Sequence, residues 1–169
     1  MVWERIPSDG WREQRGHVER YELAASMIRP GEVVLDAACG IGYGSIVLAE
    51  NAPTHTYIGV DRDAPDLLAP EACIVTDLDT WEPDFRFDVA VCFETLEHLT
   101  DPARFARILM RASRLILASV PTVPTKASNP YHLHDFTVES ALDLFAGAHV
   151  LDVIPQPAEL SHIFVLGAP

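Results

Sequence analysis

The sequence predicts an α/β fold with a seven-stranded, mostly parallel sheet that ends in an antiparallel hairpin. An apolar run, Val33 to Leu35, passes through a glycine-rich turn into a helical pattern. Further short apolar runs follow, and Phe87 to Phe93 is apolar enough for the centre of a parallel sheet. After a short helix over 137–146, runs at Val150 to Ile154 and His162 to Leu166 can pair as the terminal hairpin.

Residues 1–30 are expected to form an N-terminal helical segment after an irregular start. Between Trp11 and Ile28, apolar residues recur at intervals of three and four, which is typical of an amphipathic helix. His17, Arg20 and Tyr21 form a polar edge beside this apolar stripe. Composition alone favours a solvated helix edge.

The turn after the first strand is typical of a nucleotide-binding turn. Gly40, Gly42 and Gly44 lie between Asp36 and a helix that opens at Ser45. Glycines let a ligand approach bare backbone, and a helix N-terminus directs amide groups towards it. Ser45 stands where the dinucleotide fingerprint G-x-G-x-x-G needs its third glycine. Asp36 would repel a pyrophosphate but not an amine or a sulfonium. We therefore infer a ligand that contains a nucleoside and carries a positive charge near it.

The second strand, Thr56 to Val60, ends in Asp61, about 20 residues beyond the turn, where a carboxylate can accept both hydroxyls of a ribose. The crossover Arg62 to Pro70 contains two prolines and has room for scarcely two helical turns. A third strand is predicted at Ala72 to Val75.

The fourth strand, Phe87 to Phe93, points to one edge of the site. Ligands of open α/β sheets lie off the carboxyl ends of the strands, which places Phe93 to Thr95 at the rim. A helix is predicted to start at Asp101 because a capping residue precedes a proline, and to run to Arg111. A fifth strand follows over Arg114 to Val120.

The segment 121–136 is irregular and is predicted to be a substrate-side loop. It contains Tyr131, His132, His134 and Asp135 at the carboxyl end of a central strand, where loops meet substrates. We expect one of His132 and His134 to be functional. Two histidines and an aspartate in one pentapeptide indicate a metal only weakly, and no metal ligand is predicted.

Composition argues against several classes of protein. The 169 residues suit one domain, 1–169, and 49% hydrophobic residues with a net charge of -13 predict an acidic globular protein. The charge makes nucleic acid an improbable partner. Without a signal-peptide core or about 20 consecutive apolar residues, the chain is expected to have no membrane association and a cytoplasmic location. Cys39, Cys73 and Cys92 lack metal-type spacing and are expected to stay reduced.

Four segments, in this order and spacing, resemble the motifs of small, single-domain class I S-adenosylmethionine (SAM) dependent methyltransferases. They are VLDAACGIGYGS from residue 34, GVD from 59, VTD from 75 and FDVAVCFETLEHL from 87. The resemblance covers nearly the whole chain. It implies a three-layer Rossmann-like methyltransferase fold, with SAM as cofactor and S-adenosylhomocysteine as product.

The resemblance also implies cofactor contacts. A His-x-x-Arg-Tyr segment before the first motif would place Arg20 at the cofactor carboxylate. Asp77 would accept a hydrogen bond from the adenine amino group, although it could instead cap a turn, and Leu78 would cover the ring. The cofactor-binding residues predicted in this way are Arg20, Tyr21, Asp36, Ala38, Gly40, Gly42, Tyr43, Asp61, Arg62, Asp77, Leu78, Phe93 and Glu94.

The expected reaction is methyl transfer to an oxygen or nitrogen of a small or medium organic acceptor, mainly by positioning. His132 or His134 is the candidate general base for a hydroxyl or a protonated amine. Tyr131 and His98 complete the predicted substrate side, with a packing or orienting role favoured for His98. The segment NPYHLHDF, residues 129–136, resembles the substrate-side loop of several small-molecule methyltransferases.

Short crossovers predict an open cleft, so either the acceptor is large or carrier-tethered, or a second copy covers the site in a homodimer. Two other functions stay open. The chain could be a non-catalytic SAM-binding or interaction module, because the cofactor motifs would be the same. It could also be a NAD-dependent oxidoreductase, which Asp36 and the terminal hairpin disfavour.

Overall fold

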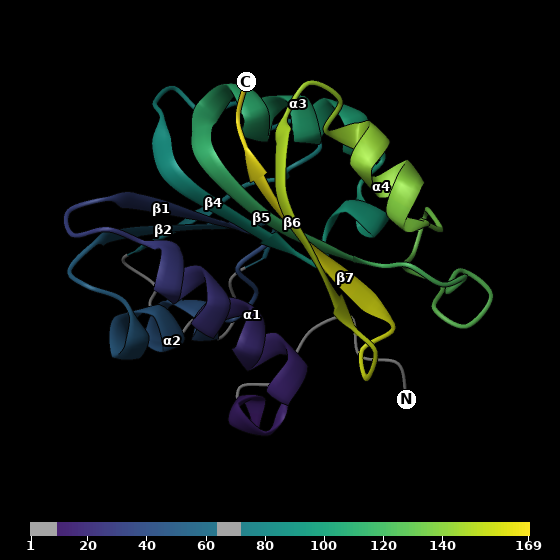
Figure 1. Ribbon diagram of the computed structural model, residues 1–169, viewed down its shortest axis with the longest axis horizontal. Helices are drawn as coiled ribbons and strands as arrows, with labels where there is room; N and C mark the ends of the chain where they lie inside the picture. Colours follow the sequence, from purple (N-terminus) through teal and green to yellow (C-terminus); the bar gives the residue numbers. More distant parts are fainter. Residues whose placement is uncertain (1–9, 64–71) are drawn as a thin grey trace.

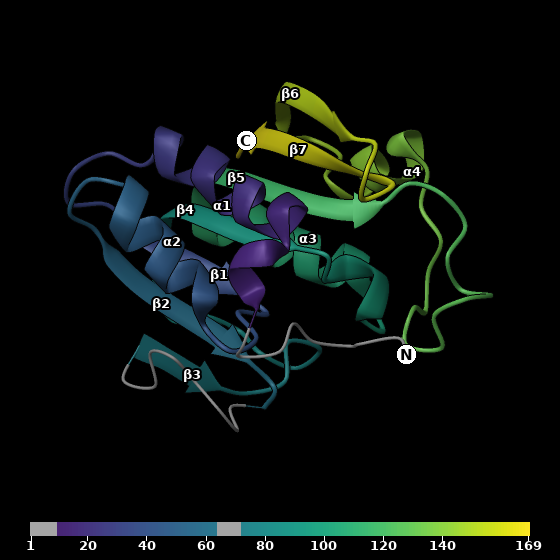
Figure 2. The same cartoon turned by 90° about the horizontal axis from the view of Figure 1, so that it is seen from below.

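The computed structural model describes residues 10–63 and 72–169, and most of the predicted crossover 62–70 lies outside them. A seven-stranded sheet runs through the molecule between two layers of helices (Figure 1). Helices α1 and α2 cover one face, and α3 and α4 cover the other (Figure 2). The predicted three-layer α/β fold is confirmed.

The strands lie in the order β3-β2-β1-β4-β5-β7-β6. Their bounds are β1 (Val33–Ala37), β2 (Thr56–Asp61), β3 (Cys73–Val75), β4 (Phe87–Phe93), β5 (Ser113–Pro121), β6 (His149–Gln156) and β7 (Ser161–Gly167). The first five strands are parallel, and β7 pairs antiparallel with both β5 and β6. The mostly parallel sheet and its terminal hairpin are therefore as predicted.

The helices are α1 (Arg15–Met27), α2 (Tyr43–Asn51), α3 (Pro102–Ala112) and α4 (Val138–Leu144), with 3-10 turns η1 (Trp11–Glu13) and η3 (Leu96–His98). Two starts follow from local capping. The Asp101 carboxylate accepts the Arg104 N–H at 2.8 Å, and Thr137 forms a capping box with Ser140. No helix in the described residues has the length and apolar character needed to cross a membrane.

Several boundaries differ from prediction by one to four residues. The helical pattern predicted from Trp11 is a 3-10 turn followed by α1 from Arg15, and α2 begins at Tyr43 instead of Ser45. The earlier start of α2 follows from Gly42, which is its N-cap in the left-handed conformation at φ 83°. The helix predicted to reach Ala146 ends at Leu144.

The strand order reverses between β1 and β4. From β1 the chain builds outwards through β2 to β3, and it then crosses back to place β4 on the other side of β1. Both strands are buried, and the Asp88 carboxylate of β4 accepts the Val33 N–H of β1 at 2.9 Å. Ligands of such sheets bind off the carboxyl ends of the strands at this reversal.

Candidate cofactor and acceptor site

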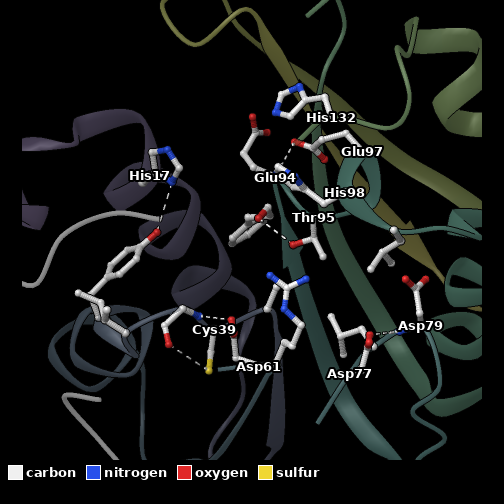
Figure 3. Close-up of a pocket in the computed structure, with 18 of the residues that line it drawn as sticks. His17, Cys39, Asp61, Asp77, Asp79, Glu94, Thr95, Glu97, His98 and His132 are labelled. Carbon is white, nitrogen blue, oxygen red and sulfur yellow. Dashed lines mark hydrogen bonds and ion pairs between the residues drawn. The ribbon is translucent and has the colours of Figure 1, made fainter. Parts of the chain in front are cut away.

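A cavity of about 440 Å³ lies at the strand-order reversal, beside the ends of β1, β2 and β4. Most predicted site residues line it: Tyr21, Ala38, Gly40, Tyr43, Asp61, Arg62, Asp77, Leu78, Phe93, Glu94, His98 and His132. The predicted residues that do not line it are Arg20, Asp36, Gly42, Tyr131 and His134. Figure 3 shows Asp61 and Cys39 at one end, with Glu97, His98 and His132 at the other.

The glycine-rich turn presents bare backbone to this cavity. Ala38, Gly40 and Gly42 all have positive φ, at 62°, 57° and 83°. A Cβ atom built on Gly40 would meet nothing within 4 Å, so this backbone borders open space. The turn is anchored where the Ala38 and Cys39 N–H groups donate to the Val60 carbonyl at 2.8 and 3.1 Å. A flat ligand can therefore lie against the chain here.

Asp61 has a fixed carboxylate at the end of β2. It is 5% exposed and accepts the N–H groups of Gly40, at 2.8 Å, and of Asp63, at 3.1 Å. These two backbone hydrogen bonds hold the Asp61 carboxylate at the cavity wall. This arrangement fits the ribose contact predicted for Asp61.

Asp36 lies behind the turn. It is 1% exposed and accepts hydrogen bonds from the Tyr21 hydroxyl at 3.0 Å and the Tyr57 hydroxyl at 2.7 Å. Burial raises the pKa of Asp36 to about 7, although both tyrosine hydrogen bonds act in the opposite direction. A Cβ atom on Gly44 would lie 2.3 Å from the Tyr21 ring, so glycine is required there. Asp36 therefore positions Tyr21, which itself lines the cavity.

Arg20 is fully buried and does not line the cavity. Its Nε donates to Gln156 Oε1 at 2.6 Å, and its Nη2 lies 3.4 Å from Glu94 Oε1. Glu94 also accepts the hydroxyls of Ser119 and Ser161 at 2.8 and 3.1 Å. Arg20 thus joins α1 to the end of β4 and to the hairpin, and its contact with a cofactor carboxylate stays a prediction.

His17 is a cavity residue that the sequence analysis did not select. Its Nδ1 accepts from Arg20 Nη1 at 3.4 Å and lies 3.3 Å from the Tyr43 hydroxyl. Because a guanidinium only donates, the neutral ring carries its proton on Nε2. Burial and the charge of Arg20 lower the pKa of His17 to about 4, so the ring is neutral at pH 7. Its position four residues before Tyr21 on one helix edge was the available signal.

Asp77 lines the cavity and also takes part in a turn, and its contact with adenine stays a prediction. Its side chain lines the cavity, while its Oδ1 accepts the Asp79 N–H at 2.9 Å within a turn. Leu78 beside it is buried and also lines the cavity. Asp77 and Leu78 together form one edge of the cavity, with an apolar side chain and one carboxylate that can accept a hydrogen bond.

The far end of the cavity contains Glu97, His98 and His132, which we call the acceptor-end cluster (Figure 3). His98 Nδ1 donates to the Tyr131 carbonyl at 3.1 Å, and His132 Nδ1 lies 2.6 Å from Thr125 Oγ1. Burial and the neighbouring His98 lower the pKa of His132. Of the two predicted loop histidines, only His132 reaches the cavity.

His134 and Tyr131 lie elsewhere. His134 Nε2 donates to the Leu99 carbonyl at 2.9 Å, and Tyr131 is 46% exposed outside the cavity. The loop is bent where the N–H groups of Leu133 and His134 donate to the Glu97 carbonyl at 2.7 and 3.3 Å. This bend separates the two histidines.

Glu97 is another cavity residue that the sequence analysis did not select. It is 1% exposed, and neither carboxylate oxygen has a hydrogen-bond partner within the described part of the chain. Burial, and then the charge of Glu94, raise the pKa of Glu97 well above its usual range. The motif places it beside His98, and its backbone carbonyl contacts the loop 121–136, which is distant in sequence.

Comparisons with known proteins place this site in a family. A sequence profile described as a methyltransferase domain matches residues 11–163. A probable S-adenosylmethionine-dependent methyltransferase of Mycobacterium tuberculosis is 30% identical over 137 residues, which cover 71% of this chain and 49% of that protein. Phosphoethanolamine N-methyltransferase 1 of Zea mays is 29% identical over 177 residues, which cover 89% of this chain and 35% of that protein. The chain thus spans half or less of the length of these relatives.

Solved structures agree on the fold. A methyltransferase in complex with the Haloferax volcanii Trm112 methyltransferase activator has a TM-score of 0.76 at 16% identity, covering 95% of this chain and 92% of its own. A Burkholderia thailandensis 1,6-didemethyltoxoflavin-N1-methyltransferase, solved with S-adenosylhomocysteine, has a TM-score of 0.72 at 19% identity. This match covers 95% of the present chain and 80% of the Burkholderia chain. The sheet, the cavity and the profile match together show that this chain belongs to the class I SAM-dependent methyltransferases.

Proposed function

We propose that the chain binds SAM in the cavity and transfers its methyl group to an oxygen or nitrogen of a small or medium organic acceptor. One observation carries this proposal. A single cavity joins the bare backbone of Gly40 and the fixed carboxylate of Asp61 to the acceptor-end cluster. The nucleoside and the acceptor would then share one space, as direct transfer between them requires.

The lining residues fit the parts of the cofactor. Asp61 would accept the ribose hydroxyls, while Asp77 and Leu78 would contact the adenine edge and ring. The cationic amino group and sulfonium would lie near the Glu94 carboxylate, with Asp36 behind it. The predicted partner of the cofactor carboxylate is Arg20.

When bound, SAM supplies a methyl group that its sulfonium already activates. The protein therefore acts mainly by aligning the acceptor and excluding water, an orientation effect worth up to several kcal/mol. A general base would add roughly 100-fold to 10,000-fold for a hydroxyl or a protonated amine. Of the two predicted bases, His132 lines the cavity, while His134 donates to a backbone carbonyl.

A small acceptor is supported by the names of two similar proteins, which give phosphoethanolamine and 1,6-didemethyltoxoflavin as methylated compounds. A carrier-tethered acceptor or a homodimer that covers the cavity is part of the same proposal. The net charge of -13 opposes a nucleic acid partner, and reduced cysteines are consistent with a cytoplasmic location.

Calorimetric titration with SAM, S-adenosylhomocysteine and NAD tests the cofactor assignment. Both sulfur ligands should bind the wild-type protein with micromolar affinity, and NAD should not bind. Asp61→Ala should abolish this binding because the ribose loses its acceptor. Asp143→Ala removes the same charge from the exposed face of α4 and should bind like wild type. Binding of NAD alone, or equal binding by Asp61→Ala, would contradict the proposal.

Release of S-adenosylhomocysteine during incubation with SAM and a broad panel of acceptors separates an enzyme from a non-catalytic SAM-binding module. Turnover with any acceptor would support the proposed reaction. Tight SAM binding without turnover on any acceptor would favour the module.

A further inference from the structure

We propose that Glu97, His98 and His132 bind a divalent transition-metal cation at the acceptor end of the cavity. Among residues 10–63 and 72–169, this is the one group of three potential ligand residues whose ligand atoms all lie within 4.8 Å of one another. The site differs from the weak pattern His132, His134 and Asp135, and it departs from the sequence-based expectation of no metal ligand.

The strongest observation is the buried carboxylate of Glu97. Among the residues that the structure describes, neither of its oxygens has a hydrogen-bond partner, and Glu97 is almost fully buried, yet it borders the cavity. A buried, unsatisfied carboxylate is costly because its lost hydration is not replaced. A cation that binds Glu97 from the cavity side would replace that hydration.

The two histidines are oriented as metal ligands usually are. His98 Nδ1 donates to a backbone carbonyl, so the neutral ring has its lone pair on Nε2, which lies 4.0 Å from Glu97 Oε1. Thr125 Oγ1 lies 2.6 Å from His132 Nδ1 and also donates to Asp135. It can accept the His132 Nδ1 proton, which leaves the lone pair on Nε2 there too. Metal-binding histidines commonly donate their second N–H in this way.

The distances require a small adjustment. Ligand atoms about 2.1 Å from a shared ion in a tetrahedral site lie about 3.4 Å apart. The widest separation in the cluster, 4.8 Å, must therefore shorten by about 1.4 Å. Rotation of the side chain of His132, which is only partly buried, can supply much of this movement.

The ligand set also indicates the kind of cation and its use. Two imidazoles and one carboxylate suit first-row ions such as Zn²⁺, Fe²⁺ or Co²⁺ better than Mg²⁺ or Ca²⁺. Three protein ligands leave a position open to an oxygen or nitrogen of the acceptor. A bound hydroxyl would lose its proton to solvent more readily, so no general base would be needed. In this arrangement His132 is a metal ligand and not a base.

Titration of chelator-treated protein with Co²⁺ tests the site without SAM or acceptor, by calorimetry and by the visible absorption of the bound ion. Wild type should bind one equivalent. Glu97→Gln and His132→Asn should each weaken binding at least about 10-fold. His149→Asn, which removes an exposed histidine at the start of β6, should bind like wild type.

Circular dichroism and thermal melts establish whether each variant is folded. Because Glu97 is buried, His132→Asn provides the test if Glu97→Gln fails to fold. Saturable binding lost in His132→Asn and kept in His149→Asn would support the site. Absence of saturable Co²⁺ binding, or equal binding by His132→Asn and wild type, would overturn it.

This inference rests on the proposed function only for what the cation does. Bound Co²⁺ in a protein that fails to bind SAM would overturn the cofactor assignment and leave the metal site standing. SAM binding without Co²⁺ binding would overturn the metal site alone.

Discussion

Asp36 shows how one buried group supports the site from behind. Its carboxylate accepts hydrogen bonds from tyrosines of α1 and β2, and Tyr21 then forms part of the cavity wall. A charged carboxylate is unfavourable in such a buried place, so burial raises the pKa of Asp36 from 3.8 to about 7. The protonation of this one residue therefore connects pH to the stability of the fold.

The sign of this effect is definite. Between about pH 4 and pH 7 the folded protein binds a proton at Asp36 that the unfolded chain has released. The contribution of Asp36 to stability is thus fully present below about pH 4 and is lost as the pH rises through 7. Its slope is at most about 1.4 kcal/mol per pH unit.

Asp36→Asn should remove this contribution. In urea unfolding at pH 5, 6 and 7, the stability of the variant relative to wild type should rise with pH. Only the wild type releases a proton from position 36 on unfolding, so only the wild type loses this stability as the pH rises. Asp143→Asn, an exposed control on α4, should keep the wild-type pH dependence. Parallel curves for Asp36→Asn and wild type would contradict a raised pKa at Asp36.

At the scale of elements, two glycines between the end of β1 and the first turn of α2 have different structural roles. Gly44 lies within α2, where a Cβ atom would be 2.3 Å from the Tyr21 ring and 2.7 Å from Asp36 Oδ2. Gly40 has φ 57° and faces open space in the cavity. The first glycine permits close packing, and the second leaves room for a ligand.

Alanine at the two positions should therefore have different effects. Gly44→Ala should lower the free energy of unfolding by about 2 to 3 kcal/mol through overpacking against Tyr21. Gly40→Ala should cost only about 1 kcal/mol of backbone strain. It should nevertheless weaken SAM binding, because its methyl group enters the cavity. Denaturant unfolding and SAM calorimetry on both variants measure these effects, and equal loss of stability would contradict this assignment.

Elements were predictable where their signals are local. Asp101 and Thr137 cap α3 and α4 through backbone groups three residues away, so short motifs contain the information. The glycine turn follows β1 directly, and Asp61 is the last residue of β2. The start of α2 was misplaced because Gly42 takes a left-handed conformation as N-cap, which the sequence pattern did not distinguish from a loop.

At the scale of the whole molecule, Arg20 connects parts that lie far apart in the chain. It contacts Glu94 at the end of β4, and Gln156 and Ser161 of the terminal hairpin. These contacts span up to 141 positions in sequence, so no local pattern could have indicated them. For the same reason the contact of Glu97 with the loop 121–136 was not foreseen, although its motif was recognised.

Arg20→Met should reveal whether this arginine stabilises the fold, binds the cofactor or does both. Removing it leaves Glu94 without its cationic partner, and we expect a loss of about 2 to 4 kcal/mol in the free energy of unfolding. Arg12→Ala breaks an exposed ion pair with Glu50 and should change stability little.

The same variant tests the predicted contact with the cofactor carboxylate. If Arg20 binds that group, Arg20→Met should weaken SAM binding more than binding of 5′-methylthioadenosine, which lacks the carboxylate. An equal effect on both ligands would limit Arg20 to a structural role. Calorimetry below the melting temperature of the variant makes the comparison.

Glu97 contacts the loop 121–136 through its backbone and belongs to the acceptor-end cluster through its side chain. Its backbone carbonyl accepts the N–H groups of Leu133 and His134, while its side chain lies in the acceptor-end cluster. Any ligand that repositions Glu97 must therefore alter the free energy of the loop conformation. Thermodynamic linkage makes this relation reciprocal. If an acceptor orders the loop, the affinity of the acceptor-end cluster for its ligand rises by some factor. A ligand bound in the cluster then favours the ordered loop by the same factor.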